Sequence, residues 1–153
     1  MAEGRSAHPL RMVDVGEKAV TAREAVASGR IKLSPEALEA ALARKLPKGD
    51  AITAAELAGI QAAKHVWEIV PLCHPLGLES AEVKIKPIDG GLEIAAHVRA
   101  ETKTGVEMEA LAAVSAAALT IYDMTKSIDR AAVITDICLQ RKSGGKSGDY
   151  KRP

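Results

Sequence analysis

A chain of 153 residues has room for one domain with a buried core, and its 21 basic and 20 acidic residues leave a net charge of +1. This balance, with 2% aromatic residues and no Phe, excludes the basic surface and the stacking platform of a nucleic-acid-binding protein. The chain has no apolar run of about 18 residues and no charged-then-apolar leader pattern, so we expect one cytoplasmic domain over residues 1–153 that does not contact a membrane.

The N-terminal part of the chain gives weak signals. Residues 1–12 contain Gly, Ser, His and Pro without a period, so we expect a flexible arm. Residues 21–27 have helical propensity, whereas the pattern from Val20 onward also alternates as in a strand. The residues alone leave the structure of residues 13–33 open.

Two helices are predicted next. Ser34 is the N-cap of a helix over residues 37–45, and Asp50 is the N-cap of a longer helix over residues 51–69. Both helices end close to a proline, which cannot continue a helix. The residues expected on their buried faces are Leu38 and Leu42 in the first helix and Ile52, Leu57, Ile60, Ala63 and Trp67 in the second.

Three strands are predicted in the second half of the chain. Residues 82–86 and 92–98 both alternate, and Asp89-Gly90-Gly91 between them is typical of a hairpin turn. A last strand is predicted over residues 132–139. Its alternation puts Val133, Thr135, Ile137 and Leu139 on one face.

The stretch between the hairpin and the last strand, residues 104–128, is the centre of the predicted fold. Its middle, from Ala110 to Ile121, is free of Gly and Pro, and its only polar side chains are those of Ser115 and Thr120. A helix that is apolar on all sides is buried, and about a dozen such residues are too few to span a bilayer. We therefore expect a central packing helix.

Charged residues lie only at the two ends of this helix. Glu107 and Glu109 come first, where the helix dipole favours carboxylates, and Asp123 and Lys126 follow at a spacing that makes them neighbours. An ordinary surface ion pair is the plain alternative for Asp123 and Lys126. Glu109 and Asp123 are fourteen residues apart, roughly 21 Å in a continuous helix. Either the two ends serve different purposes, or one site takes its two sides from neighbouring subunits, and we favour the second interpretation.

The predicted order is strand, helix, helix, strand, strand, helix, strand. Connections of this kind place the helices on one face of an antiparallel sheet. The sequence therefore predicts an α+β fold, a ferredoxin-like antiparallel sheet with helices on one face and one extra helix.

Two short segments have chemical potential. Lys48-Gly49-Asp50 puts a lysine and a bare backbone at a helix N-terminus, which is a natural anion site, although a plain helix start is the commoner reading. His74, in a turn braced by two prolines, is a candidate acid, base or phosphate ligand, and equally an ordinary turn histidine. Cys73 and Cys138 form neither a disulfide framework nor a zinc pattern, and Cys73 by itself fits a packing residue.

The C-terminal residues 142–153 are basic, rich in glycine and without core residues, so we expect a mobile tail. Its Gly144–Gly148 segment resembles the end of a P-loop, but Gln140 stands where the first glycine is required and no helix follows. The segment is not a P-loop. It can still close over phosphates with the charges of Lys142 and Lys146, or serve only as a solubilising tail.

These candidates share a theme, in which cations face an anion and carboxylates provide acid–base or amine contacts. That combination fits a phosphorylated small molecule that carries a nitrogen heterocycle. The cations are Arg23, Lys48, His74, Lys126, Lys142 and Lys146, and the carboxylates are Glu107, Glu109 and Asp123.

Seven blocks, in order along the chain, also resemble the MoaC family of molybdenum cofactor biosynthesis, the cyclic pyranopterin monophosphate synthases. Any one block is a weak signal, whereas seven in order are specific. The blocks are Met12-Val-Asp-Val, Lys48-Gly-Asp, Ala58-Gly-Ile-Gln-Ala-Ala-Lys64, Pro71-Leu-Cys-His-Pro-Leu76, Thr104-Gly-Val-Glu-Met-Glu-Ala-Leu111, Leu119-Thr-Ile-Tyr-Asp-Met124 and Lys142-Ser-Gly-Gly-Lys-Ser-Gly148.

The resemblance implies a ferredoxin-like homohexamer, a trimer of dimers with active sites at the dimer interface, and a strand over residues 19–33. The family rearranges 3′,8-cyclo-7,8-dihydroguanosine 5′-triphosphate to cyclic pyranopterin monophosphate and releases pyrophosphate. By motif, the catalytic positions are Lys48, Asp123 and Lys126. The expected substrate-binding residues are Arg23, Leu72, Cys73, His74, Glu107, Met108, Glu109 and Lys142, with Lys146 of the tail added for its charge.

The sequence itself requires no cofactor and no resident metal, and Mg²⁺ accompanying the triphosphate fits the chemistry. A lysine crowded by other cations loses affinity for its proton and becomes a base, a role we expect for Lys48 and Lys126. Two other functions stay open at this point. One is a non-catalytic module that binds a nucleotide, and the other is an enzyme for a different pterin or purine triphosphate.

Overall fold

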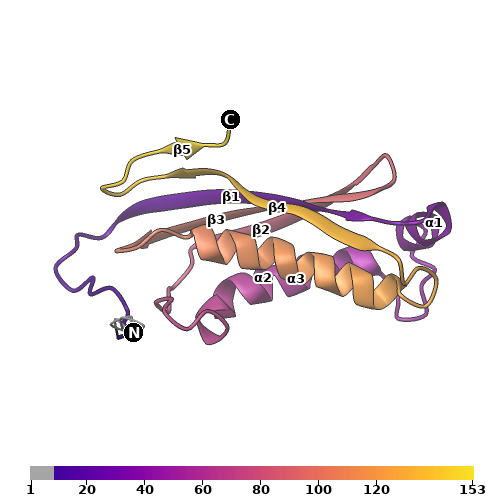
Figure 1. Ribbon diagram of the computed structural model, residues 1–153, viewed down its shortest axis with the longest axis horizontal. Coiled ribbons are helices and arrows are strands. Elements are labelled where there is room, and N and C mark those ends of the chain that lie inside the picture. Colours follow the sequence, from indigo (N-terminus) through magenta and orange to yellow (C-terminus); the bar gives the residue numbers. More distant parts are fainter. Residues whose placement is uncertain (1–8) are drawn as a thin grey trace, which may run out of the picture.

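The computed structural model describes residues 9–153 (Figure 1). Most of the expected arm, residues 1–8, lies outside the described residues. Its last part, residues 9–12, forms no helix or strand. The elements are β1 (Thr21–Lys32), α1 (Pro35–Leu42), α2 (Ala51–His65), the short 3-10 helix η1 (Val66–Glu68), β2 (Ser80–Ile88), β3 (Gly91–Thr102), α3 (Glu107–Thr125), β4 (Val133–Ser143) and β5 (Tyr150–Lys151).

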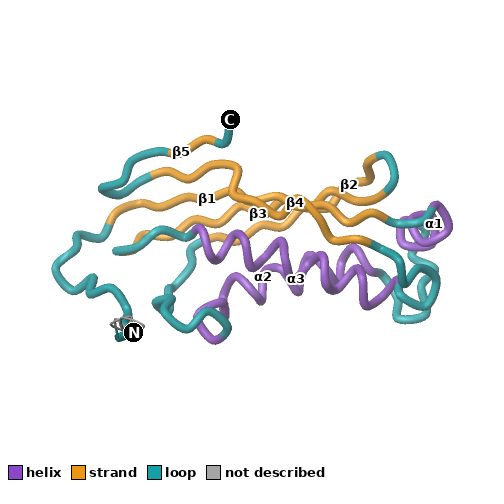
Figure 2. Tube along the Cα trace, viewed as in Figure 1, coloured by secondary structure: helices purple, strands orange, loops and turns teal. Residues whose placement is uncertain are grey.

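The five strands form one sheet in the order β2-β3-β1-β4-β5, and every neighbouring pair is antiparallel. Helices α2 and α3 cover one face of this sheet, and the additional helix α1 lies beyond its end (Figure 2). Strands β1 to β4 with α2 and α3 make a split β-α-β arrangement. The α+β fold predicted from the sequence is therefore confirmed.

The ambiguous residues 21–32 form the central strand β1. Strand structure prevails over helical propensity because both edges of the segment are paired, with β3 on one side and β4 on the other. Alternate side chains of Ala25, Ala27 and Ile31 are fully buried against the helices. Tertiary pairing thus decides what the sequence pattern leaves open.

Strand β4 departs from the predicted pattern of residues 132–139. A register irregularity opposite residues 28–30 of β1 coincides with Asp136, whose φ is +57°. Such a bulge reverses the side of the sheet to which later side chains point. Val133 is consequently 50% exposed, while Ile134, Ile137 and Leu139 pack against the core. The prediction that Val133 shares one face with Ile137 and Leu139 is therefore wrong.

The faces predicted for α1 and α2 are confirmed in part, because Leu38 packs against the core while the most deeply buried residues of both helices are small. Ala37 and Ala41 are the buried residues of α1, and Leu42 is exposed. In α2, Leu57 is 60% exposed and Trp67 beyond it is also exposed. The fully buried residues of α2 are Ala51, Ala55, Gly59 and the predicted Ala63, and the predicted Ile52 and Ile60 are partly buried against the core.

Close packing of α2 against α3 explains why small residues of α2 are the most deeply buried. A Cβ added at Gly59 would lie 2.8 Å from the carbonyl oxygen of Ala113 and 2.9 Å from a Val83 methyl group. Only small residues permit two helix backbones to approach this closely. The larger side chains of α2 therefore lie beside the contact and not within it.

Helix α3 occupies the centre of the fold, and its buried residues run from Glu109 to Thr125. Its apolar middle packs against the sheet and α2, as the sequence predicted. Within residues 9–153, no helix combines the length and the apolar character needed to cross a membrane.

The two ends of α3 point to opposite ends of the molecule (Figure 1). Its N-terminus lies beside the start of β1 and the C-terminal hairpin, and its C-terminus lies near α1. The hairpin differs from the expected mobile tail, since β4 continues to Ser143 and β5 pairs with it. Gly144 and Gly145, with φ values of +90° and +77°, make the turn that returns the chain.

Strand β2 forms one edge of the sheet. Lys84 and Lys86 are exposed along it and pair with Glu82 and Glu93, respectively. Pro87 near its end has no backbone N–H.

Candidate active site in two halves

The first half of the site surrounds Asp123 in the last turn of α3. Its Oδ2 accepts a hydrogen bond from Lys48 Nζ at 2.5 Å, and its Oδ1 accepts one from Lys126 Nζ at 2.8 Å. Lys126 is the C-cap residue of α3 and lies beside Asp123 as its spacing predicted. All three side chains are about half exposed, so the cluster is open to a ligand.

Local structure carries Lys48 to this position. It lies in the loop between α1 and α2, which an isolated bridge between Leu46 and Gly49 closes. Gly49 has a φ of +103°, which favours glycine, and Asp50 then caps α2 by accepting from the backbone of Ile52 and Thr53. The loop therefore turns over the end of α3 and delivers one ammonium group.

Hydrogen bonds in this cluster shift the pKa values of Asp123 and Lys126. Hydrogen bonds from Lys126 and Lys48 hold the pKa of Asp123 at about 2. In return, the hydrogen bond to Asp123 raises the pKa of Lys126. The expected lowering of the pKa of Lys126 by surrounding cations is therefore not what the structure gives: Lys126 is bonded to a carboxylate, which shifts its pKa in the opposite direction.

The second half of the site lies around the N-terminus of α3. Glu109 is only 3% exposed, and burial raises its pKa to about 7, with a further contribution from Glu107. Desolvation here outweighs the helix dipole, which alone would favour the charged form. Burial and the charge of Glu109 also raise the pKa of Cys73, so the turn containing Cys73 and the first turn of α3 share one environment.

The remaining predicted residues of this end are partly accessible. Leu72 is 45% and Met108 is 39% exposed, which leaves two apolar side chains facing solvent beside the buried Glu109. His74 is half-buried in the turn after Cys73. An exposed apolar pair next to a buried carboxyl group can contact the ring of a heterocycle and its N–H groups.

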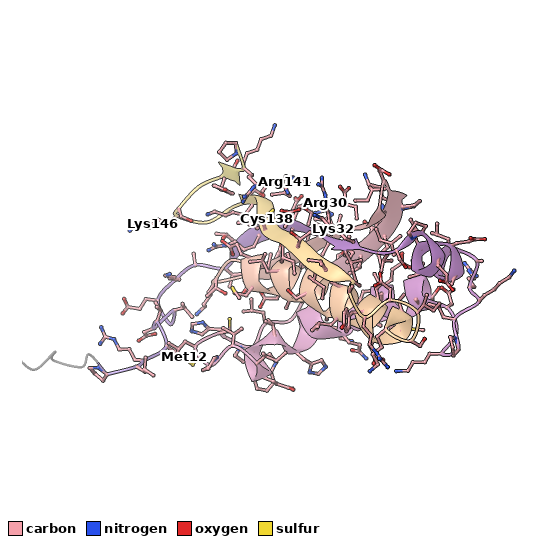
Figure 3. All side chains as sticks on the ribbon, turned by 45° about the vertical axis from the view of Figure 1, so that its right-hand side comes forward. Met12, Arg30, Lys32, Cys138, Arg141 and Lys146 are labelled. Atoms are coloured by element: carbon pink, nitrogen blue, oxygen red, sulfur yellow. The ribbon has the colours of Figure 1, made fainter. Side chains whose placement is uncertain are left out.

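A pocket of about 650 Å³ lies at the same end of the molecule, between the start of β1 and the C-terminal hairpin. Arg23 and Lys146 both line it, and Lys142 donates a hydrogen bond of 2.5 Å to Ser147 at its rim. Figure 3 shows Lys146 at the outer end of the hairpin, with Arg30 and Lys32 farther along the sheet. The full lining is Lys18, Ala19, Thr21, Arg23, Gly145, Lys146 and Ser147, without a carboxylate.

Sequence reasoning did not single out Lys18, Thr21 or Ser147. A signal for Thr21 was present, because a strand places residues two apart on the same side, and Thr21 precedes Arg23 by two positions. This spacing is informative only once the segment is known to be a strand, and the residues alone leave the structure of residues 13–33 open.

Among residues 9–153, no three His, Cys, Asp or Glu side chains are grouped so that they could hold a metal ion. The groups around Arg23 are cations and hydroxyls, which bind phosphate oxygens and not cations.

The structure thus assembles the predicted residues into groups at opposite ends of α3. Lys48, Asp123 and Lys126 meet at its C-terminal end, and the expected substrate-binding residues gather at its N-terminal end (Figure 1). The helix between Glu109 and Asp123 is continuous, which separates them by roughly 21 Å. One chain therefore does not bring the two halves to the same small ligand.

Fold and site together define a ferredoxin-like α+β protein with charged sites at both ends of its central helix. The model of the MoaC family matches residues 12–145, and the chain belongs to this family. The predicted family is confirmed.

Several relatives match nearly the whole chain. Cyclic pyranopterin monophosphate synthase of Chloroflexus aurantiacus is 57% identical over 94% of this chain and 89% of its own length. The synthase of Streptomyces griseus is 53% identical over 93% and 80%, respectively. Cyclic pyranopterin monophosphate synthase 3 of Mycobacterium bovis is 53% identical over 93% and 81%.

Proposed function

We propose that this protein is a cyclic pyranopterin monophosphate synthase, a lyase-type enzyme of molybdenum cofactor biosynthesis. It converts (8S)-3′,8-cyclo-7,8-dihydroguanosine 5′-triphosphate to cyclic pyranopterin monophosphate and releases pyrophosphate. Relatives with this name are 51–57% identical to the chain. The observation that carries the proposal is the Asp123 carboxylate held between the ammonium groups of Lys48 and Lys126.

The protonation states of this cluster assign its roles. Opening the dihydropurine ring adds water across a C–N bond, so a proton must reach the nitrogen as oxygen attacks the carbon. Lys126 gives that proton to the nitrogen. Asp123, ionised at neutral pH, orients both lysines and relays the proton lost by the attacking water back to Lys126. Lys48 sits on the other carboxylate oxygen, where its charge balances the anionic substrate.

The other half of the site suits the remaining parts of the substrate. Glu109, with its pKa of about 7, can exchange a proton with the N–H edge of the heterocycle near neutral pH. Arg23, Lys142 and Lys146 supply positive charge where pyrophosphate leaves. Any Mg²⁺ in the reaction arrives bound to the triphosphate as part of the substrate.

A complete site in this proposal combines two subunits. The roughly 21 Å between Glu109 and Asp123 is longer than the reacting part of one substrate molecule, which supports a contribution from a neighbouring chain. The proposed assembly is a homohexamer, a trimer of dimers with sites at the dimer interface. Its proposed location is the cytoplasm, which agrees with the two free thiols of Cys73 and Cys138.

The direct test of the reaction is incubation of the purified protein with the cyclic dihydro-GTP substrate, followed by assays of pyrophosphate and of the oxidised fluorescent pterin. Appearance of both products in equal amounts is expected. Binding without either product would instead favour a regulatory nucleotide-binding module. Turnover of another pterin or purine triphosphate, without turnover of this one, would move the protein to a different enzyme class.

The shared site can be tested by mixing two inactive variants. Asp123→Ala removes the catalytic end, and Glu109→Gln alters the other end with little change in shape. If one site uses Asp123 of one chain and Glu109 of another, mixed assemblies contain some intact sites and regain part of the activity. The matched control mixes Asp123→Ala with Lys126→Ala, which damage the same end and should not recover. Equal results for both mixtures would contradict a shared site.

A further inference from the structure

The guanidinium group of Arg23 is fixed along one edge by hydrogen bonds within the chain. Its Nε donates to Thr21 Oγ1 at 2.8 Å, and its Nη2 donates to the carbonyl oxygen of Lys103 at 3.3 Å. Thr21 and Arg23 lie on the same side of β1 because they are two residues apart in a strand. Two anchors of this kind determine the plane of the guanidinium, and Nη1 is the nitrogen that neither anchor engages.

The turn of the C-terminal hairpin lies directly over this guanidinium. A Cβ added at Gly145 would fall 2.1 Å from Nη1 of Arg23 and 2.4 Å from its Cζ. Gly145 also has a φ of +77°, a conformation that favours glycine. The turn is held closed by the bond from Lys142 to Ser147 and by the Gly148 amide, which donates to the Gly145 carbonyl oxygen at 3.1 Å.

The charges around this contact are unbalanced. Lys18, Arg23 and Lys146 line the pocket, and none of them has a carboxylate within ion-pair distance among residues 9–153. A salt bridge to a carboxylate would orient an arginine and also neutralise its charge. Here, the neutral acceptors Thr21 Oγ1 and the Lys103 carbonyl orient Arg23 and leave its positive charge uncompensated.

We propose that Thr21 is a positioning residue that orients Arg23 toward a diphosphate group bound in this pocket. This inference rests on the proposed function, because the diphosphate is the part of the substrate that leaves as pyrophosphate. Planar, bidentate contacts between a guanidinium and phosphate oxygens depend on the orientation of the plane. Without the Thr21 acceptor, the guanidinium can rotate about its last bonds and its contact with phosphate weakens.

Three variants of the full-length protein separate this role from a general effect on folding. Thr21→Val keeps the shape and removes the acceptor, and Thr21→Ser restores a hydroxyl at the same place. Thr135→Val makes the same chemical change in β4, opposite Arg30 and away from the pocket. Circular dichroism and thermal melting establish that all three are folded. The probe is inorganic pyrophosphate, measured by calorimetry, with kcat and KM for the cyclic substrate measured in parallel.

Thr21→Val should weaken pyrophosphate binding by about tenfold, the order expected for one hydrogen bond to a charged group, and raise KM by a similar factor. Thr21→Ser should recover most of the affinity, and Thr135→Val should match the original protein. Gly145→Ala, which pushes a methyl group into the guanidinium, should lower affinity at least as much.

Pyrophosphate affinity unchanged in Thr21→Val, or lost equally in Thr21→Ser, would overturn the inference. Failure of the unaltered protein to bind pyrophosphate would also overturn it. A protein that binds pyrophosphate but does not convert the cyclic substrate would refute the proposed function alone. The comparison of Thr21→Val with Thr21→Ser would still decide the role of Thr21 in that case.

Discussion

Replacement of Glu109 by Gln should make the protein more stable at alkaline pH while it damages the site. Glu109 is 3% exposed at the start of α3, and its burial raises the pKa from 4.5 to about 7. A buried carboxyl group with this pKa is tolerated when neutral and costs free energy when charged. The amide side chain that Glu109→Gln introduces has nearly the same shape and no charge at any pH.

The size and sign of the effect follow from proton linkage. Below pH 4.5 the carboxyl group is protonated in both folded and unfolded chains, so it contributes no pH dependence. Between pH 4.5 and about 7, the folded protein keeps a proton that the unfolded chain has released, and stability falls as pH rises. Above pH 7 the full penalty applies, about 3 kcal/mol for a shift of this size.

Urea unfolding followed by the fluorescence of Trp67, the only tryptophan, measures this effect. The advantage of Glu109→Gln over the original protein should grow by about 3 kcal/mol between pH 4.5 and pH 8, at one fixed protein concentration. The exposed Glu39→Gln serves as a control for loss of charge alone. A stability difference that stays constant over this pH range would refute the reasoning.

Two further predictions concern the packing of α2 and the catalytic cluster. Gly59→Ala should destabilise the protein by about 1–3 kcal/mol in urea unfolding, because its Cβ would meet the backbone of α3 at Ala113. An unchanged unfolding midpoint would contradict the close packing of the two helices. Lys48→Met and Lys126→Met should each abolish turnover with little change in melting temperature, whereas the exposed Lys45→Met should stay active. Normal turnover by either cluster variant would remove that lysine from the mechanism.

The sequence predicted well those features that depend on neighbours along the chain. Ser34 and Asp50 cap α1 and α2 as expected, because their side chains accept from amides two or three residues later. The i,i+3 spacing of Asp123 and Lys126 likewise predicted a contact within one helix. Only a shared chemical theme and a family motif connect Lys48 with this pair in the sequence, since its contact with Asp123 spans 75 positions.

Features that depend on distant parts of the chain were not predictable from one sequence. The exposure of Leu57 follows from how closely α2 approaches α3, which the apolar periodicity does not encode. The bulge at Asp136 changes the register of β4 against β1, and these two strands are far apart in the sequence. The raised pKa of Glu109 required knowledge of burial, and the position of Glu109 in the first helical turn indicated the opposite direction.

The edge strand β2 bears on how copies of the protein can join. Pro87 cannot donate a backbone hydrogen bond to an incoming strand, and the ion pairs of Lys84 and Lys86 put charged side chains along the same border. Addition of strands from further copies would therefore be interrupted at this border, which discourages open-ended growth into fibres. In the proposed assembly, subunits meet through side chains at the ends of α3, and such self-complementary contacts close into a particle of fixed size.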